Sequence, residues 1–148
     1  MAESLITLLS AAYTVEQKSL AAIKKHLITA DNPDTEVRIR AHFVETQWQI
    51  KLLKACLELL GIDREALDAK ECRRPAETGG TGLLAIKRLE IDLYKKVIVE
   101  ARRQHAPEVL QACREILEQE RAMAEWIEDN HFMASPPFPV RGWTSVTA

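Results

Sequence analysis

The sequence has no long apolar run, no excess of charge of one sign and no basic segment ahead of its first apolar residues. No uncharged apolar run approaches the roughly 18 residues that a membrane-spanning helix needs, and the missing basic segment argues against a signal peptide. The 20 basic and 22 acidic residues leave a net charge of −2. This balance gives no electrostatic reason to expect a nucleic acid or an anionic membrane as a partner.

Cysteine, glycine and proline are also scarce. The three cysteines, Cys56, Cys72 and Cys113, are odd in number and widely spaced, with no Cys-x-x-Cys pair. They fit a reducing cytosol, so we expect a cytoplasmic protein. The 5 glycines and 6 prolines cluster between periodic segments, where residues that end and begin helices belong.

Helical periodicity dominates the rest of the chain. Apolar residues recur with the 3.6-residue spacing of amphipathic helices in four long segments. These segments span residues 4–30, 33–60, 83–104 and 107–129. Asn32 is a suitable N-cap, and Pro33 and Pro107 each stand at a first helical position, where a missing N–H costs nothing. Gly61 is a natural residue just beyond a helix C-terminus.

These segments predict an all-α, ferritin-like four-helix bundle over residues 1–130, followed by an irregular, proline-rich tail at 131–148. The first two helices form one hairpin and the last two form another. A long crossover between the second and third helices distinguishes a ferritin-like bundle from an up-down-up-down one. The two hairpins are similar in length, which suggests an internal duplication.

Each helix carries one glutamate on the face that its apolar residues predict to be buried. These residues are Glu16, Glu45, Glu90 and Glu120. The predicted buried row of the second helix is Ala41, His42, Glu45, Gln49, Leu52, Cys56 and Leu59. Ionised carboxylates are rarely buried without a partner, so four of them close together must take up protons, find a cation or share metal ions.

Metal binding is one solution. Two divalent ions balance four negative charges, and bridging carboxylates are the basis of di-iron and di-manganese sites in helical bundles. The four glutamates therefore predict a site for two Fe or Mn ions. Such sites usually add a histidine three residues after the glutamate on two helices, but Trp48 and Met123 stand at these positions here. His42 and Gln49, one turn from Glu45, are further candidate ligands.

A metal-free core accounts for the same residues. In this alternative the glutamates hydrogen-bond to polar neighbours, namely Tyr13, His42, Gln49 and Tyr94. Lys87, one turn before Glu90, supplies an internal positive charge. Both alternatives stay open, and no residue is assigned a catalytic role. The stretch at 78–82 lacks the Lys-Ser/Thr of a phosphate-binding loop, so no nucleotide cofactor is expected.

Four segments together resemble the YciE/YciF family of bacterial ferritin-like proteins. The matching segments are 12–19 (AYTVEQKS), 42–46 (HFVET) with Gln49, 90–94 (EIDLY) and 116–126 (ILEQERAMAEW). The resemblance covers residues 8 to about 130, in register through all four helices. The last segment is most similar to the YciE branch.

This resemblance implies a homodimeric, stress-associated bundle with a two-metal site and no settled biochemical activity. Any activity would be redox chemistry on O₂ or peroxide, and the family's inward glutamates fall on the four positions named above. One departure has consequences for the site. The family tends to have a glutamate three residues before Glu90, and here that residue is Lys87. An ammonium at this position neutralises carboxylate charge and competes with a cation.

Overall fold

The computed structural model of the chain describes residues 2–72 and 82–130, and every regular element within these ranges is an α-helix. The helices are α1 (Ala2–Thr29), α2 (Pro33–Leu59), α3 (Arg64–Cys72), α4 (Leu83–Arg103) and α5 (Pro107–Asp129). The four long helices agree with the predicted segments to within two residues at each end. None of the described helices is long and apolar enough to cross a membrane.

Local sequence signals set the helix ends where the pattern predicted them. The Asn32 side chain accepts hydrogen bonds from the backbone N–H groups of Asp34 at 2.8 Å and Thr35 at 3.2 Å. It thereby caps α2, whose first residue is Pro33. Gly61 follows the end of α2 with φ +96°, a conformation in which a side chain would be strained.

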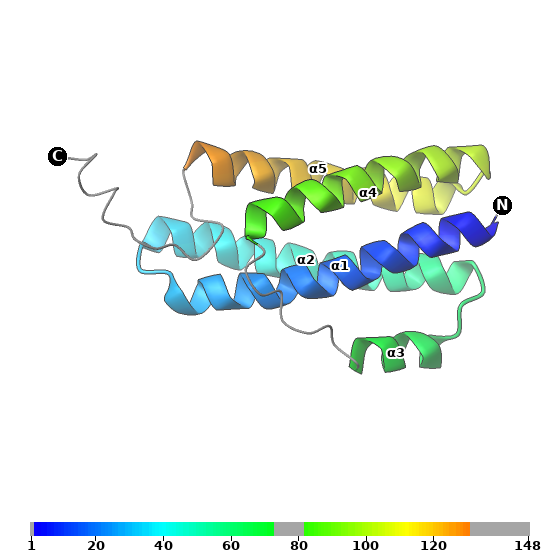
Figure 1. Cartoon of the computed structure of the whole chain (residues 1–148), viewed down its shortest axis with the longest axis horizontal. Coiled ribbons are helices and arrows are strands. Elements are labelled where there is room, and N and C mark those ends of the chain that lie inside the picture. The colour runs from blue at the N-terminus through cyan, green and yellow to red at the C-terminus, as the bar shows by residue number, and fades with distance from the viewer. Residues whose placement is uncertain (1, 73–81, 131–148) are drawn as a thin grey trace.

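The long helices pack as a four-helix bundle (Figure 1). α1 packs against α2 and α4, and α5 packs against the same two helices. α2 and α4 run in the same direction, so the connection between them joins opposite ends of the bundle, and α3 lies along its outside (Figure 1). This is the predicted ferritin-like topology with a long crossover. The expectations for residues 73–81 and for the tail at 131–148 lie outside the described residues.

A polar layer divides the core into two hydrophobic clusters. The larger cluster surrounds the first half of α1 and includes Leu5, Leu9, Leu53, Leu57, Val97 and Ile116. The smaller one surrounds the second half of α1 and includes Ile23, Ile39, Leu83, Ile86 and Met123. Between them, on all four helices, lie fully buried polar side chains: Glu16, Ser19, His42, Thr46, Gln49, Lys87, Glu90 and Glu120.

The buried face of α2 differs from the predicted one. The buried residues are Ile39, His42, Thr46, Gln49, Ile50, Leu53, Cys56 and Leu57. The predictions that Ala41 and Leu59 face inward are wrong, because both are exposed. The error has a physical cause: α2 carries apolar residues on its outer side as well, so its sequence holds two competing apolar rows. α4, by contrast, carries a single buried row, formed by Leu83, Ile86, Lys87, Glu90, Tyr94, Val97 and Ala101.

Replacing the cap residue tests the assignment of the α2 N-terminus. Asn32→Ala should lower the free energy of unfolding by about 1 kcal/mol, because two backbone N–H groups lose their acceptor. Urea denaturation followed by circular dichroism measures the change. The neighbouring Asp31→Ala is the control, since Asp31 is exposed and should shift stability by less than about 0.5 kcal/mol. Equal effects of the two substitutions would contradict the cap.

Candidate functional site

Three of the four predicted glutamates meet at the centre of the bundle. Glu16 of α1, Glu90 of α4 and Glu120 of α5 are fully buried. One carboxylate oxygen from each lies within 4.8 Å of the others. The prediction that Glu45 is buried with them is wrong, because its side chain is 32% exposed. Glu45 stands one position away from the buried residue of its turn, Thr46.

Lys87 lies among these carboxylates. Its Nζ is 2.7 Å from Glu90 Oε1 and 2.7 Å from Glu120 Oε1, forming two buried ion pairs. The ammonium donates hydrogen bonds to Glu120 and, at 2.9 Å, to Ser19 Oγ, and a further contact of 2.9 Å joins it to His42 Nε2. The three N–H groups of the ammonium are thus used within the polar layer.

Only some of the carboxylate oxygens of these three glutamates accept a hydrogen bond in the described structure. Glu16 Oε2 accepts a hydrogen bond from the Tyr94 hydroxyl at 2.7 Å. Four other carboxylate oxygens are buried without a hydrogen-bond donor: Glu16 Oε1, both oxygens of Glu90, and Glu120 Oε2. Glu90 Oε1 has its ion pair with Lys87 but not a hydrogen bond of good geometry. Buried oxygens of this kind require a proton, a donor or a cation.

His42 connects the cluster to the edge of the bundle. Its Nδ1 lies 2.8 Å from Glu45 Oε1, and its Nε2 faces Lys87. Burial and the charge of Lys87 lower the pKa of His42 to about 3, so the ring is neutral. A neutral ring that accepts from the ammonium at Nε2 must donate from Nδ1 to Glu45. His42 therefore serves as a partner of Lys87 in the structure.

The remaining predicted residues lie around the cluster rather than in it. The side-chain amide of Gln49 donates to Gln119 Oε1 at 2.8 Å. Tyr13 is fully buried, and its hydroxyl donates a hydrogen bond to the backbone carbonyl of Leu67 at 3.4 Å. This hydrogen bond goes to the backbone, whereas the metal-free alternative predicts a hydrogen bond between Tyr13 and a glutamate. The Tyr94 hydroxyl, by contrast, donates its hydrogen bond to Glu16 of the cluster.

Ser19 of the polar layer, and the partly buried Gln119 that accepts from Gln49, were not predicted as site residues. Ser19 lies one turn after Glu16 on the buried face of α1, and its hydroxyl accepts from Lys87. A small hydroxyl on an apolar stripe is a weak signal, because it packs there without any ligand. From the sequence, Ser19 can be placed on the buried face of its helix, but its hydrogen bond to Lys87 cannot be predicted.

Two of the carboxyl groups hold protons more strongly than usual. Burial, together with the charges of Glu90 and Glu120, raises the pKa of Glu16 well above its ordinary value. Burial and the charge of Glu120 also raise the pKa of Glu90 to about 7, although Lys87 acts in the opposite direction. Near neutral pH, Glu90 is therefore close to its titration midpoint, and Glu16 holds a proton more strongly than an exposed glutamate does.

Lys87 and Glu120 form the ionised pair of the cluster. Burial alone would lower the pKa of Lys87, but Glu120, Glu90 and Glu16 together raise it above its ordinary value. Burial alone would likewise raise the pKa of Glu120, but the charge of Lys87 and its hydrogen bond bring it below its usual range. Glu120 is therefore the carboxylate that keeps its charge beside the ammonium.

The cluster has the donor set of a cation site. Three carboxylates from three helices converge, and four of their oxygens are buried without a hydrogen-bond donor. Oxygen-only ligands suit hard divalent cations. The buried triad of Glu16, Glu90 and Glu120 can therefore hold a metal ion.

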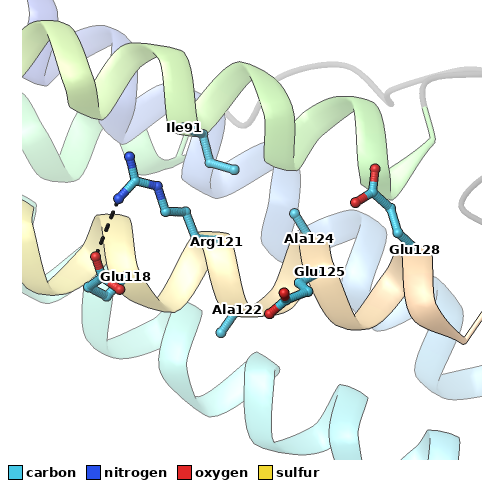
Figure 2. A pocket seen from close by; sticks show the side chains of 7 residues that line it. All are labelled: Ile91, Glu118, Arg121, Ala122, Ala124, Glu125 and Glu128. Carbon is cyan, nitrogen blue, oxygen red and sulfur yellow. Dashed lines mark hydrogen bonds and ion pairs between the residues drawn. The ribbon is translucent and has the colours of Figure 1, made fainter.

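A depression on the outer surface is separate from this cluster (Figure 2). It lies between α4 and α5 and is lined by Ile91, Glu118, Arg121, Ala122, Ala124, Glu125 and Glu128. Arg121 donates to Glu118 at 3.4 Å beside it (Figure 2). Among the described residues, none of the three buried glutamates lines this depression. The depression and the glutamate cluster are therefore different features of the structure.

Removing the internal charge tests the role of Lys87. Lys87→Met should lower the free energy of unfolding by roughly 3 to 5 kcal/mol, because Glu120 is left buried without its cation. The double substitution Lys87→Met/Glu120→Gln should recover much of this loss, since both members of the pair are then neutral. Lys24→Met, at an exposed position of α1, is the control. A loss for Lys87→Met no larger than that of the control would contradict the ion pairs.

The raised pKa of Glu90 predicts a pH-dependent stability. Between pH 4.5, its ordinary value, and about 7 the folded chain binds more protons at this site than the unfolded chain. Its contribution to the free energy of unfolding therefore falls as the pH rises, by roughly 3 kcal/mol over this window. Glu90→Gln removes the titration, so the variant should gain on the wild type between pH 4.5 and 8.

Urea denaturation in the presence of a chelator at several pH values measures this difference. The exposed Glu118→Gln is the matched control and should follow the wild type throughout. If Glu90→Gln also ran parallel to the wild type, Glu90 would not be titrating in this range.

Comparisons with known proteins agree with the fold. The family described as "Domain of unknown function (DUF892)" matches residues 1–81 and 80–133. A crystal structure of a protein from Xanthomonas campestris pv. campestris is 30% identical, with a TM-score of 0.71, over 86% of this chain and 88% of that one. No curated protein sequence matches the chain. The closer resemblance to the YciE branch stays a prediction. The chain belongs to the DUF892 family, that is, to the YciE/YciF-type ferritin-like proteins.

Proposed function

We propose that this protein binds one divalent metal ion in the centre of its bundle, with Glu16, Glu90 and Glu120 as ligands. The observation that carries the proposal is the set of four carboxylate oxygens that are buried together without a hydrogen-bond donor. These oxygens belong to the three glutamates whose ligand atoms converge within 4.8 Å.

The charge of the cluster favours one ion over two. When a cation displaces the protons of Glu16 and Glu90, three ionised carboxylates and one ammonium carry two formal negative charges in the polar layer. One divalent ion balances them, whereas two divalent ions would leave a buried positive excess, which is costly. Glu45, the fourth ligand of the predicted two-ion site, lies toward the surface and is hydrogen-bonded to His42. Lys87 thus takes the place of a second cation.

Each neighbouring residue has a defined part in such a site. The Tyr94 hydroxyl holds Glu16 from one side and leaves its other oxygen for the ion. Lys87 fixes Glu120 and Glu90 through Oε1 of each. Ser19 and His42 in turn take up the other hydrogen bonds of the Lys87 ammonium. The carboxylates are therefore positioned before an ion arrives, which reduces the cost of binding.

Fe²⁺ and Mn²⁺ are the ions that we propose, because carboxylate oxygens suit them and ferritin-like bundles use them. When bound, either ion would supply redox chemistry on O₂ or peroxide. We further propose a role under stress conditions in the bacterial cytosol, supported by the family and by two buried, unpaired cysteines, Cys56 and Cys113.

The metal-free alternative rests on a different observation. Glu16 and Glu90 both have raised pKa values, caused first by their burial. Protons on these two groups, together with Lys87, neutralise the cluster without any metal. In this alternative the bundle is a structural or interaction protein, and the polar layer serves to fix the packing of the helices.

Two glutamine substitutions separate the candidates. Glu16→Gln copies the protonated form of Glu16, so the metal-free protein should keep its fold and stability, yet its affinity for Mn²⁺ should fall by roughly a hundredfold or more. Glu45→Gln is the matched control, because Glu45 is a partly buried glutamate outside the triad. It should bind Mn²⁺ like the wild type. Isothermal titration calorimetry with Mn²⁺ measures both.

Two outcomes would count against the metal site as proposed. Unchanged affinity in Glu16→Gln, or a loss confined to Glu45→Gln, would mean that other residues hold the ion. A folded wild-type protein that takes up neither Mn²⁺ nor Fe²⁺ would favour the metal-free alternative.

A further inference from the structure

Tyr94 joins the proposed metal site to the larger hydrophobic cluster. It stands on α4, one turn after Glu90, and its side chain is fully buried. Its hydroxyl donates a hydrogen bond to Glu16 Oε2 at 2.7 Å, while Glu16 Oε1 is buried without a donor. When Glu16 Oε1 binds the proposed ion, a single carboxylate therefore separates the phenol of Tyr94 from the metal.

A site with one ion is one electron short of reducing peroxide. Reduction of hydrogen peroxide to two water molecules takes two electrons, and Fe²⁺ gives up one when it becomes Fe³⁺. A two-ion site supplies both electrons from its metal. Here Lys87 stands in place of a second cation, with its Nζ 2.7 Å from both Glu90 and Glu120. The second electron must therefore come from a side chain or from another molecule.

The Tyr94 hydroxyl has a base in place for its proton. A phenol that loses an electron becomes strongly acidic, so its oxidation is easiest where a hydrogen-bonded base accepts the proton in the same step. The Glu16 carboxylate is such a base once a cation has displaced its own proton. Glu16 Oε2 can then take the phenolic proton while Oε1 stays with the ion.

The surroundings of Tyr94 also protect a radical on its ring. Tyr94 belongs to the larger hydrophobic cluster, together with Val97 and Ala101 of the same row of α4, and none of its surface is exposed. Water and dissolved reductants are thus kept away from the ring. Trp48, by contrast, is 55% exposed, so a radical there would be open to solvent.

Tyr13 provides a natural comparison. It is buried as completely as Tyr94, but its hydroxyl donates to the backbone carbonyl of Leu67 at 3.4 Å. An amide carbonyl is a far weaker base than a carboxylate, so it cannot take up the phenolic proton. The two tyrosines therefore differ in the group that receives the proton and not in their burial.

We infer that Tyr94 supplies the second electron when a single Fe²⁺ ion in the polar layer reduces peroxide. This inference rests on the proposed metal site. Hydrogen peroxide gains two electrons, one from Fe²⁺, which becomes Fe³⁺, and one from the Tyr94 phenol, which becomes a neutral tyrosyl radical. The O–O bond breaks, and two protons from solvent complete two water molecules. The phenolic proton passes to Glu16 Oε2.

Electron paramagnetic resonance tests the inference. The full chain is loaded with one equivalent of Fe²⁺ without oxygen, and frozen rapidly after one equivalent of hydrogen peroxide is added. The wild type should show a tyrosyl radical, and Tyr94→Phe should lose it. Tyr13→Phe is the matched control and should keep the signal. Because the sequence has two tyrosines, a tyrosyl radical in Tyr13→Phe can lie only on Tyr94, and ring-deuterated tyrosine should narrow its signal.

The iron oxidised per peroxide is a second measurement. In the wild type one peroxide should oxidise one Fe²⁺ ion. In Tyr94→Phe both electrons must come from iron, so the ratio should double. A ferrous chelator measures the Fe²⁺ that remains, and inductively coupled plasma mass spectrometry checks that the variant still binds iron. If the hydrogen bond from Tyr94 only positioned Glu16, this ratio would not change.

The outcomes separate a failure of this inference from a failure of the metal site. A folded wild type that binds no iron would remove the site and the inference together. Bound iron without a tyrosyl radical in Tyr13→Phe would overturn the inference alone. A tyrosyl radical that survives in Tyr94→Phe would also overturn it, because the electron would then come from Tyr13.

Discussion

The structure depends on one ammonium group among three buried carboxylates. Lys87 contacts Glu90 and Glu120 at 2.7 Å in a core without exposed atoms, and neither charge would be tolerated there alone. Its position requires helices α1, α2, α4 and α5 to meet in one register, because its partners come from all four. The polar layer therefore specifies how the bundle is assembled, in addition to any ligand that it binds.

The two hydrophobic clusters supply the stability that such a layer consumes. They lie on either side of it along every long helix, so the polar groups are shielded from water at both ends. Burial is also what raises the pKa of Glu16 and Glu90 and what leaves carboxylate oxygens without donors. Shielding from water makes it costly to bury the charged carboxylates. For the same reason, the layer favours the binding of a small cation or of protons, which neutralise this charge.

Most of the fold could be predicted from the sequence, because its signals are local. Asn32 and Gly61 predict where α2 begins and ends, and the apolar residues of α4 form a single row that predicts one buried face. α2 was harder, because its apolar residues form an inner and an outer row. A shift of one position exchanges Glu45 for Thr46 on the buried face, so the prediction that Glu45 is buried with the other three glutamates is wrong.

The contacts across the bundle lay beyond what spacing can show. Lys87 could be named as an internal cation from its position one turn before Glu90, but its bonds to Ser19 and His42 join helices far apart in sequence. Which oxygens stay unpaired depends on those contacts as well. The number of cations that the site can hold therefore followed only from the assembled structure.

That number is the most direct test of the role given to Lys87. Inductively coupled plasma mass spectrometry on the wild-type protein, after loading with excess Fe²⁺ or Mn²⁺ and removal of free ions, counts the metal bound per chain. If the ammonium stands in place of a second cation, each chain holds one ion. Two ions per chain would contradict this, because Lys87 would then have to leave the carboxylates, and none would mean that protons alone neutralise the cluster.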